Sequence, residues 1–332
     1  MKYLNALKII IFCFLTYACT STTEKEVILY EIKKDGKWGW YKDGDKEINP
    51  RYSGEILNGK PNGKGSILFP DGAEYHGELK NGKLNGYGKY SYHHGDIYEG
   101  EWLDNKKHGK GKYKWGKSSK WSGDEFDGQW YENKEHGYGK YTSSNGNIYQ
   151  GQWKNGMQTG RGTWITSDRF YSGYFLNDKL NGIGAMIRSS GEQAIGWWKD
   201  GNQINVHYYK ETGKYIGSII DGKKSNLENN ENILFGRVKK GEPEWSLLKS
   251  PSYKAKYIGE TKNEKPHGWG TLRMPGDRLY IGKFKNGKMN GFGITHRKRK
   301  EDIGIGIHKG TKPMDIIIYK KNGQIIGKYK KK

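Results

Sequence analysis

Pairs of glycines are the residues of this sequence that come closest to a known chemical motif, a phosphate-binding loop. A G-x-G pair holds a phosphate when it follows a strand, continues as G-x-G-x-x-G and opens a helix, because backbone N–H groups then point at the anion. None of the pairs here continues in that pattern, and no segment has helical periodicity. We therefore interpret as strand glycines the pairs Gly63/Gly65, Gly86/Gly88, Gly109/Gly111, Gly137/Gly139, Gly160/Gly162, Gly182/Gly184, Gly268/Gly270 and Gly291/Gly293.

Cysteine and histidine offer no recognisable catalytic or metal site. Both cysteines, Cys13 and Cys19, fall within the first 19 residues, so the nine histidines lack the cysteine partners of a zinc finger. The sequence also contains no G-x-S-x-G, H-E-x-x-H or P-loop motif. We predict a protein that is not an enzyme, with no catalytic residue, metal or cofactor. A hydrolase without a known motif is the less favoured alternative.

Three histidines occupy one position of the glycine pattern. His108, His136 and His267 each precede the first glycine of a G-x-G pair, where other copies have asparagine. They could form a stacked histidine ladder, or they could be turn residues interchangeable with asparagine. We favour the second interpretation, because asparagine before glycine is typical of tight turns.

Positive charge is concentrated near the C-terminus. The net charge is +22, and residues 253–332, with 21 lysines and arginines and six acidic residues, carry +15 of it. Such a segment could bind anionic lipid head groups or acidic polymers, or it could keep an exposed sheet edge soluble. We predict no specific nucleic-acid ligand. The candidate anion-binding residues are Arg297, Lys298, Arg299, Lys300, Lys328, Lys330, Lys331 and Lys332.

The glycines belong to a repeat of about 23 residues, and we expect each repeat to form strands of the fold. The chain has 50 glycines, 25 tyrosines and 12 tryptophans but only 33% hydrophobic residues, so stacked rings must form its core. In one unit, Tyr98, Gly100 and Trp102 alternate with glutamates and therefore share one face of a strand. Glycine there leaves a slot in which we expect an aromatic ring of a neighbouring hairpin to lie against the backbone.

Two turns are expected in each unit. Asn-Gly pairs beginning at Asn62, Asn85, Asn181 and Asn290 predict tight turns between the two strands of a hairpin. A second set of turns should join one hairpin to the next, at Asp71-Gly72, Gly95-Asp96, Asn145-Gly146 and Gly276-Asp277.

This pattern resembles the membrane occupation and recognition nexus (MORN) repeat, whose signature is Y-x-G-x-W-x-x-G-x-x-x-G-x-G. The resemblance implies an all-β protein, an elongated twisted ribbon of about twelve consecutive antiparallel β-hairpins. It also implies contact with lipids and a role in protein assembly. The residues that carry the signature are Tyr98, Gly100, Trp102, Gly109 and Gly111 in one unit, and Tyr149, Gly151, Trp153, Gly160 and Gly162 in another.

The repeat spacing also sets the expected division of the chain. Residues 28–51 should form an N-terminal capping hairpin, and residues 52–199 the main repeat array. Degenerate repeats follow at 200–256, where G-x-G is lost. Repeats return at 257–296, and residues 297–332 form a basic C-terminal cap.

The first residues predict export. Residues 1–18 combine Lys2 and Lys8 with a short apolar run, well under the ~20 residues that span a bilayer, and they end in Ala18. Cys19 follows, which resembles a bacterial lipoprotein signal, although Thr16 stands where leucine is usual. We expect a signal peptide over 1–18, lipidation of Cys19 and a flexible tether over 19–27. Simple cleavage that leaves a free Cys19 is the alternative.

Together these features predict an exported scaffold in a bacterial cell envelope. It would be held to a membrane through lipidated Cys19, on the periplasmic or the surface side. It would bind an unidentified protein partner, anionic lipid head groups or acidic polymers. An antitoxin or immunity-type binding protein is the main alternative, although a cytoplasmic antitoxin should lack residues 1–18.

Overall fold

The computed structural model describes residues 27–225, 232–239, 242–247, 254–310 and 312–331. Consecutive antiparallel strands make up nearly all of this part of the chain, which confirms the predicted all-β ribbon of hairpins. The expected signal peptide, Cys19 and nearly all of the 19–27 tether lie outside the described residues, so their assignment stays a prediction.

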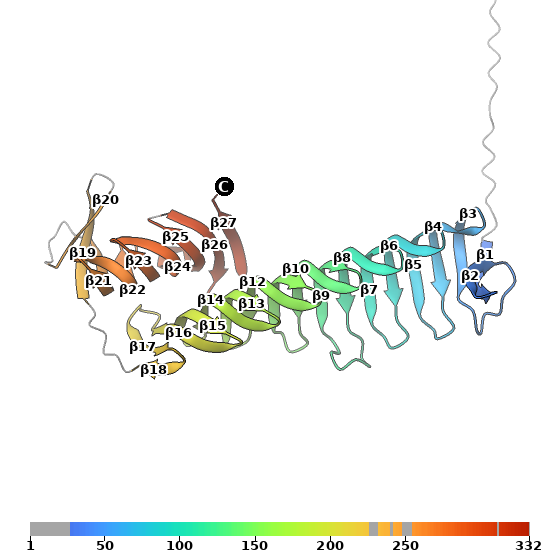
Figure 1. The fold of residues 1–332 in the computed structure, drawn as a ribbon, viewed down its shortest axis with the longest axis horizontal. Coiled ribbons are helices and arrows are strands. Elements are labelled where there is room, and N and C mark those ends of the chain that lie inside the picture. Colours follow the sequence, from blue (N-terminus) through green and yellow to red (C-terminus); the bar gives the residue numbers. More distant parts are fainter. Residues whose placement is uncertain (1–26, 226–231, 240–241, 248–253, 311, 332) are drawn as a thin grey trace, which may run out of the picture.

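The strands form two sheets (Figure 1). The first sheet contains β1 (Val27–Lys34), β2 (Lys37–Tyr41), β3 (Arg51–Leu57), β4 (Lys60–Leu68), β5 (Glu74–Lys80), β6 (Lys83–Ser91), β7 (Ile97–Leu103), β8 (Lys106–Lys114), β9 (Glu125–Tyr131), β10 (Lys134–Thr142), β11 (Ile148–Lys154), β12 (Met157–Ile165), β13 (Arg169–Leu176), β14 (Lys179–Arg188), β15 (Gln193–Lys199), β16 (Asn202–Tyr209), β17 (Tyr215–Ile220) and β18 (Lys223–Ser225). The second sheet contains β19 (Asn232–Lys239), β20 (Glu242–Ser246), β21 (Ala255–Lys262), β22 (Lys265–Met274), β23 (Arg278–Lys285), β24 (Lys288–Arg297), β25 (Asp302–Lys309), β26 (Lys312–Lys320) and β27 (Ile325–Lys330). A short 3-10 turn, η1 (Lys298–Lys300), joins β24 to β25.

The tight turn of each hairpin lies earlier in the repeat than expected. The expectation for Asn62, Asn85, Asn181 and Asn290 was wrong, because these residues lie inside strands β4, β6, β14 and β24. Each unit has a pair of residues with positive φ four positions upstream, such as Asn58 and Gly59, and this pair makes the turn. The second set of turns is where it was predicted, for example at Gly72 with φ 85°.

The first glycine of each G-x-G pair forms a β-bulge. Gly109 has φ 57°, and the register of β7 and β8 shifts between Gly100 and Trp102. The Glu101 carboxylate lies where a side chain on Gly109 would be and accepts a hydrogen bond from the backbone N–H of Lys110 (3.0 Å). Glycine is needed here because a bulge with positive φ and a side chain overhead leaves no room for a Cβ atom. His108 lies in strand β8 beside this bulge, not in a turn.

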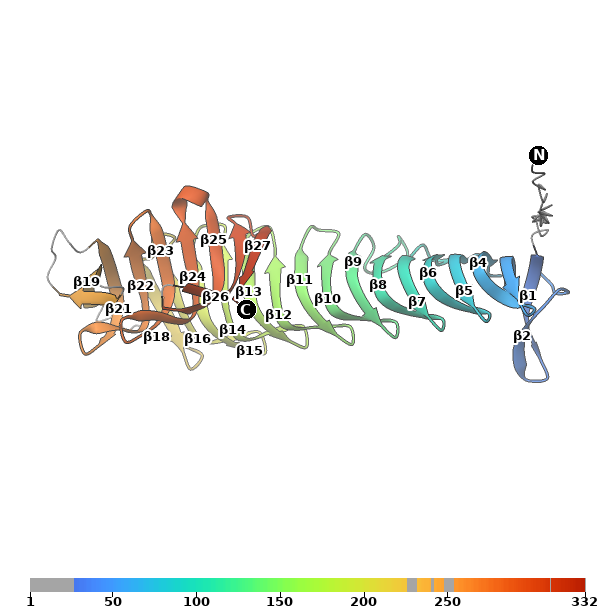
Figure 2. The same ribbon diagram turned by 90° about the horizontal axis from the view of Figure 1, so that it is seen from above.

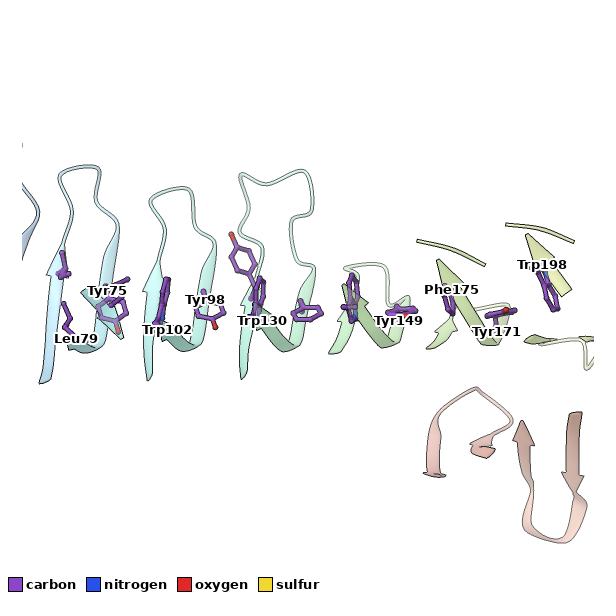
Figure 3. Packing of buried hydrophobic residues seen from close by; sticks show 14 of the residues in the cluster. Tyr75, Leu79, Tyr98, Trp102, Trp130, Tyr149, Tyr171, Phe175 and Trp198 are labelled. Atoms are coloured by element: carbon purple, nitrogen blue, oxygen red, sulfur yellow. The ribbon is translucent and has the colours of Figure 1, made fainter. Parts of the chain in front are cut away.

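A continuous row of rings forms the core of the first sheet (Figure 3). Trp102 lies edge-to-face between Tyr98 of its own hairpin (5.0 Å between ring centroids) and Tyr75 of the preceding one (5.8 Å). The same alternation continues through Trp130, Trp153 and Phe175 to Trp198. We call the face that carries these rings the inner face.

Hydrogen bonds fix the orientation of the rings. The Tyr98 hydroxyl donates to the Glu101 carbonyl (2.9 Å), and the Trp102 indole N–H donates to the Gly88 carbonyl of the preceding hairpin (3.2 Å). A side chain on Gly111 would collide with the Tyr98 ring. The glycine slot is therefore filled by the tyrosine of the same hairpin, and the expectation of a neighbouring hairpin's ring was wrong in this detail.

The second sheet doubles back and packs on the first (Figures 1 and 2). Its outer face contributes Ile281, Ile294 and Ile305 to a shared core with Ala185 and Ile195 of the first sheet. At the corresponding outer-face positions of β6 to β9 the residues are charged, with Lys89 opposite Glu99 and Lys112 opposite Asp127. Strands with aliphatic residues on both faces need cover on both sides, which explains why the ribbon folds over at its C-terminal half.

Polar contacts fix this packing. The Tyr319 hydroxyl shares hydrogen bonds with the Thr163 and Ser172 hydroxyls, each at 2.7 Å, and all three residues are buried. The Arg161 guanidinium pairs with the Asp315 carboxylate at 2.6 Å. His296 contacts the Gln193 amide oxygen at 3.0 Å.

We predict that Trp153→Ala lowers the free energy of unfolding by about 3–5 kcal/mol, because truncating a buried aromatic side chain removes its packing on both sides. Trp153 is 8% exposed and contacts Phe126 and Tyr149. Trp197→Ala is the matched control, since this ring is 47% exposed and its loss should change stability by less than about 0.5 kcal/mol. Urea unfolding of both variants checks this, and equal effects would contradict the ring-stack description.

We predict that the packed sheets lose stability as pH falls from about 6.5 towards 4. Burial lowers the pKa of His296 to about 4. In that window the unfolded chain binds a proton on His296 that the folded chain does not, so the free energy of unfolding decreases by about 2 kcal/mol at pH 5. Urea unfolding at pH 7.5 and 5.0 should show a smaller pH effect in His296→Gln. A variant with the unchanged wild-type pH dependence would refute this role.

Candidate functional site

A large hollow with a basic rim lies on the inner face of the second sheet. Its volume is about 840 Å³, within the range of small-ligand sites. We call it the basic hollow. Its apolar floor includes Trp245, Leu272, Met274, Met289 and Ile316, and its cationic side chains are Arg237, Lys254, Arg278, Lys288, Arg297, Lys309 and Lys312. Among the described residues that line it, none is acidic.

The hollow exists because ring positions of the repeat are occupied by smaller residues. The pairing of Gly293 with Gly306 places Gly304 where tyrosine stands in other units, as Tyr98 does before Gly100. On the second strands, Leu272 and Thr295 take the position that Tyr113 holds in the first sheet. The inner face of the second sheet is therefore left partly unfilled.

A histidine ends the row of rings at this point. His308 takes the tryptophan position and lies edge-to-face on Tyr280, with ring centroids 4.9 Å apart. Its Nε2 atom is 3.0 Å from the Thr295 hydroxyl, and its Nδ1 atom is 3.1 Å from the Gly306 carbonyl. Burial lowers the pKa of His308 to about 4, although the contact with Gly306 acts in the opposite direction. The ring is therefore neutral at pH 7, and the charge of the hollow comes from lysine and arginine.

Two of the cations are held by acidic partners at the rim. Arg297 makes a bidentate ion pair with the buried Asp302 carboxylate (2.6 Å for both bonds), and Arg237 pairs with Glu244 at 2.7 Å. Within the described residues, the structure shows no ion pair for Lys254, Arg278, Lys309 or Lys312. The hollow consequently keeps a surplus of positive charge over an apolar floor, a combination that suits an anionic amphiphile.

The structure separates the basic residues predicted from the sequence. Arg297 lines the hollow, whereas the Lys328 ammonium contacts the Tyr138 hydroxyl of the first sheet at 3.0 Å. Arg299 and Lys300 are exposed in η1, and Lys330 and Lys331 are exposed at the end of β27. The Lys298 side chain and Lys332 lie outside the described residues.

Sequence reasoning missed the other six cations of the hollow, Arg237, Lys254, Arg278, Lys288, Lys309 and Lys312. Most of these cations lie in the basic segment after residue 253, but the charge excess of that segment did not show which of them share a face.

The residues of the repeat signature have a structural role and do not line the hollow. Tyr98, Gly100, Trp102, Gly109, Gly111, Tyr149, Gly151, Trp153, Gly160 and Gly162 build the ring row and its bulges.

Neither a metal-binding cluster nor a membrane-spanning helix occurs in the part of the chain that the structure describes. No group of three or more histidine, cysteine or acidic residues is arranged to hold a metal ion there. Among the same residues, no helix has the length and apolar character needed to cross a membrane.

Comparisons with known proteins identify the repeat. A sequence model of the MORN repeat matches residues 52–74, 75–97, 98–120, 126–148, 149–168, 171–193 and 280–298. No curated protein sequence matches the chain. The unit at 257–279 falls outside these matches but has the same construction, with the Tyr257 hydroxyl bonded to the Glu260 carbonyl at 2.6 Å.

Solved structures give a weaker likeness. The TCP domain of Drosophila melanogaster SAS-4, in complex with a proline-rich motif of Ana2, is 10% identical over 46% of this chain and 81% of that one, with a TM-score of 0.30. The TCP10 domain of Danio rerio CPAP, in complex with a STIL peptide, is 12% identical over 83% of this chain and 98% of that one, with a TM-score of 0.19.

Proposed function

The chain is a MORN repeat protein, a repeat scaffold for binding, and from this premise we propose a non-enzymatic role in the bacterial cell envelope. The basic hollow would bind the head group of an anionic lipid and the first part of its acyl chain. The observation that carries this proposal is the surplus of lysine and arginine around an apolar floor.

Charge and apolar surface would act together in such a complex. A lysine or arginine near an anionic lipid surface contributes about 1 kcal/mol, and burial of apolar area contributes roughly 25 cal/mol per Å². A hydrophilic acidic polymer would use the rim but leave the half-buried Trp245 and Met274 of the floor in contact with water. The apolar floor therefore favours a lipid over a polymer.

The position of the hollow in the molecule is compatible with a tethered scaffold. β1 and β2 lie at one end of the long first sheet, and the strands that surround the hollow lie towards the other end (Figure 1). If Cys19 is lipidated, the chain would be anchored beyond β1 and would present the hollow at a distance from its anchor. Binding of a protein partner along the exposed part of the ribbon stays a prediction.

We predict that charge removal in the hollow weakens lipid binding. The protein for this test begins at Cys19 and carries Cys19→Ser, so that it has neither signal nor acyl chain. Replacing Arg278, Lys309 and Lys312 with glutamine should weaken co-sedimentation with anionic vesicles about 100-fold, at about 1 kcal/mol for each cation. Binding should also weaken as salt rises, since exposed charges are screened beyond ~10 Å at 0.1 M.

The control has the same net charge. Lys60, Lys64 and Lys110 are exposed on the first sheet, and their replacement with glutamine should leave vesicle binding close to wild type. Equal losses in the two triple variants would show that net charge alone drives binding and would overturn the assignment to the hollow. Equal binding of the wild type to neutral vesicles would do the same.

We also predict that the native protein is cleaved after Ala18 and acylated on Cys19. Mass spectrometry of the protein extracted from its own membranes should show an N-terminal peptide that begins with a lipid-modified cysteine. The Cys19→Ser variant should lose this modification and be released by washing. An intact Met1, or an unmodified Cys19 in the native protein, would refute the anchor.

A further inference from the structure

One connection in the repeat array is twice as long as its neighbours. Residues 115–124 join β8 to β9, whereas five residues join β6 to β7 and β10 to β11. The long connection is folded on itself, because the Gly123 and Asp124 N–H groups donate to the Trp115 and Trp121 carbonyls. It is also attached to the next connection, where the Ser144 N–H donates to the buried Asp124 carboxylate (2.8 Å). The extra residues therefore form a fixed platform.

This platform forms one wall of a second hollow, separate from the basic hollow and on the first sheet. Its volume is about 320 Å³, at the low end of the range for small-ligand sites. Two indole rings line it, Trp121 from the extra residues and Trp164 from β12, and they are 50% and 37% exposed. Two exposed rings that line the same hollow point to a binding site, whereas a single exposed ring does not.

The remaining lining residues are mostly neutral hydrogen-bonding groups. Asn145, Asn147 and Ser144 come from the next connection, and Gln158 comes from β12. The backbone N–H groups of Asn147 and Gln158 donate hydrogen bonds within the protein, and both residues line the hollow. Lys120 is the single cation in the lining, and its ammonium lies over the Trp121 ring, 4.9 Å from the centroid.

We propose that this second hollow binds a neutral saccharide, with a pyranose ring of the glucose or N-acetylglucosamine type against Trp121 and Trp164. The apolar C–H face of such a ring, in which the hydroxyls are equatorial, matches the electron-rich face of an indole. Its hydroxyls match amide and hydroxyl groups placed around the edge of a small hollow. An acidic ligand would fit less well, because Asp124 is also in the lining and only one lysine opposes it.

The test is a titration of the full chain with two neutral trisaccharides, tri-N-acetylglucosamine and cellotriose, followed by calorimetry or ligand-observed NMR. We expect saturable binding of at least one of them, unaffected by salt. Trp121→Ala should weaken binding at least tenfold, and so should deletion of residues 117–121, which restores the usual length of the connection. Trp197→Ala is the control, because that exposed ring lies outside the hollow.

The outcomes separate this site from the lipid proposal. Replacement of Arg278, Lys309 and Lys312 with glutamine should leave saccharide binding unchanged. No saturable binding of either trisaccharide to the wild type would overturn the proposal. Equal affinity of the wild type and Trp121→Ala would also overturn it, with Trp121→Ala shown by circular dichroism to keep the wild-type fold.

Discussion

The structure depends on the edge-to-face contact between the tyrosine of one hairpin and the tryptophan of the next. An isolated hairpin is marginally stable in water, so each unit needs its neighbours. The Trp102 ring meets Tyr75 and Tyr98 at interplanar angles close to 90°, and its N–H reaches the backbone of the preceding hairpin. Orientation, spacing and register of the hairpins all follow from this contact, because it joins side chain and backbone across each boundary.

The ring contacts also require glycine at fixed positions of the repeat. Tyr98 can lie flat against the strands only because Gly100 and Gly111 have no side chains. Where the pattern changes, the fold changes with it. Ala194 replaces the tyrosine in β15, and the ring row of the first sheet ends at Trp198. Gly304 replaces it in β25, and the basic hollow opens beside it.

Much of the fold could be predicted from the sequence, because the repeat is strict. The all-β ribbon, the shared face of Tyr98, Gly100 and Trp102, and the turns between hairpins follow from spacing and alternation. The turn within each hairpin was misplaced, because half of the units with a G-x-G pair contain two candidate turn pairs, such as Asn58-Gly59 and Asn62-Gly63. Each pair contains a residue with positive φ, but Asn58-Gly59 forms the turn and Asn62-Gly63 lies at the bulge.

The packing of the two sheets and the hollow were harder to predict. Aliphatic residues at Ile195, Ile281 and Ile294 signal a second buried face, but they do not identify the sheet that covers it. The basic hollow arises from side chains that are missing from the repeat, and a missing ring has no sequence motif of its own. The lysines and arginines around it come from six different strands or their ends, so only the three-dimensional arrangement brings them together.

One double variant tests most directly whether the missing ring at Gly304 creates the hollow. Gly304→Tyr combined with Ile316→Gly restores the tyrosine and the facing glycine of an ordinary repeat. The backbone at Gly304 does not have a left-handed φ, and the Ile316 side chain is the nearest obstacle to a new Cβ atom, at 3.3 Å. Binding of anionic vesicles and urea unfolding should be measured on this variant and on wild type. We expect the double variant to be at least as stable as wild type and to bind vesicles at least about tenfold more weakly, which corresponds to roughly 1.4 kcal/mol. Unchanged affinity in a folded double variant would contradict it.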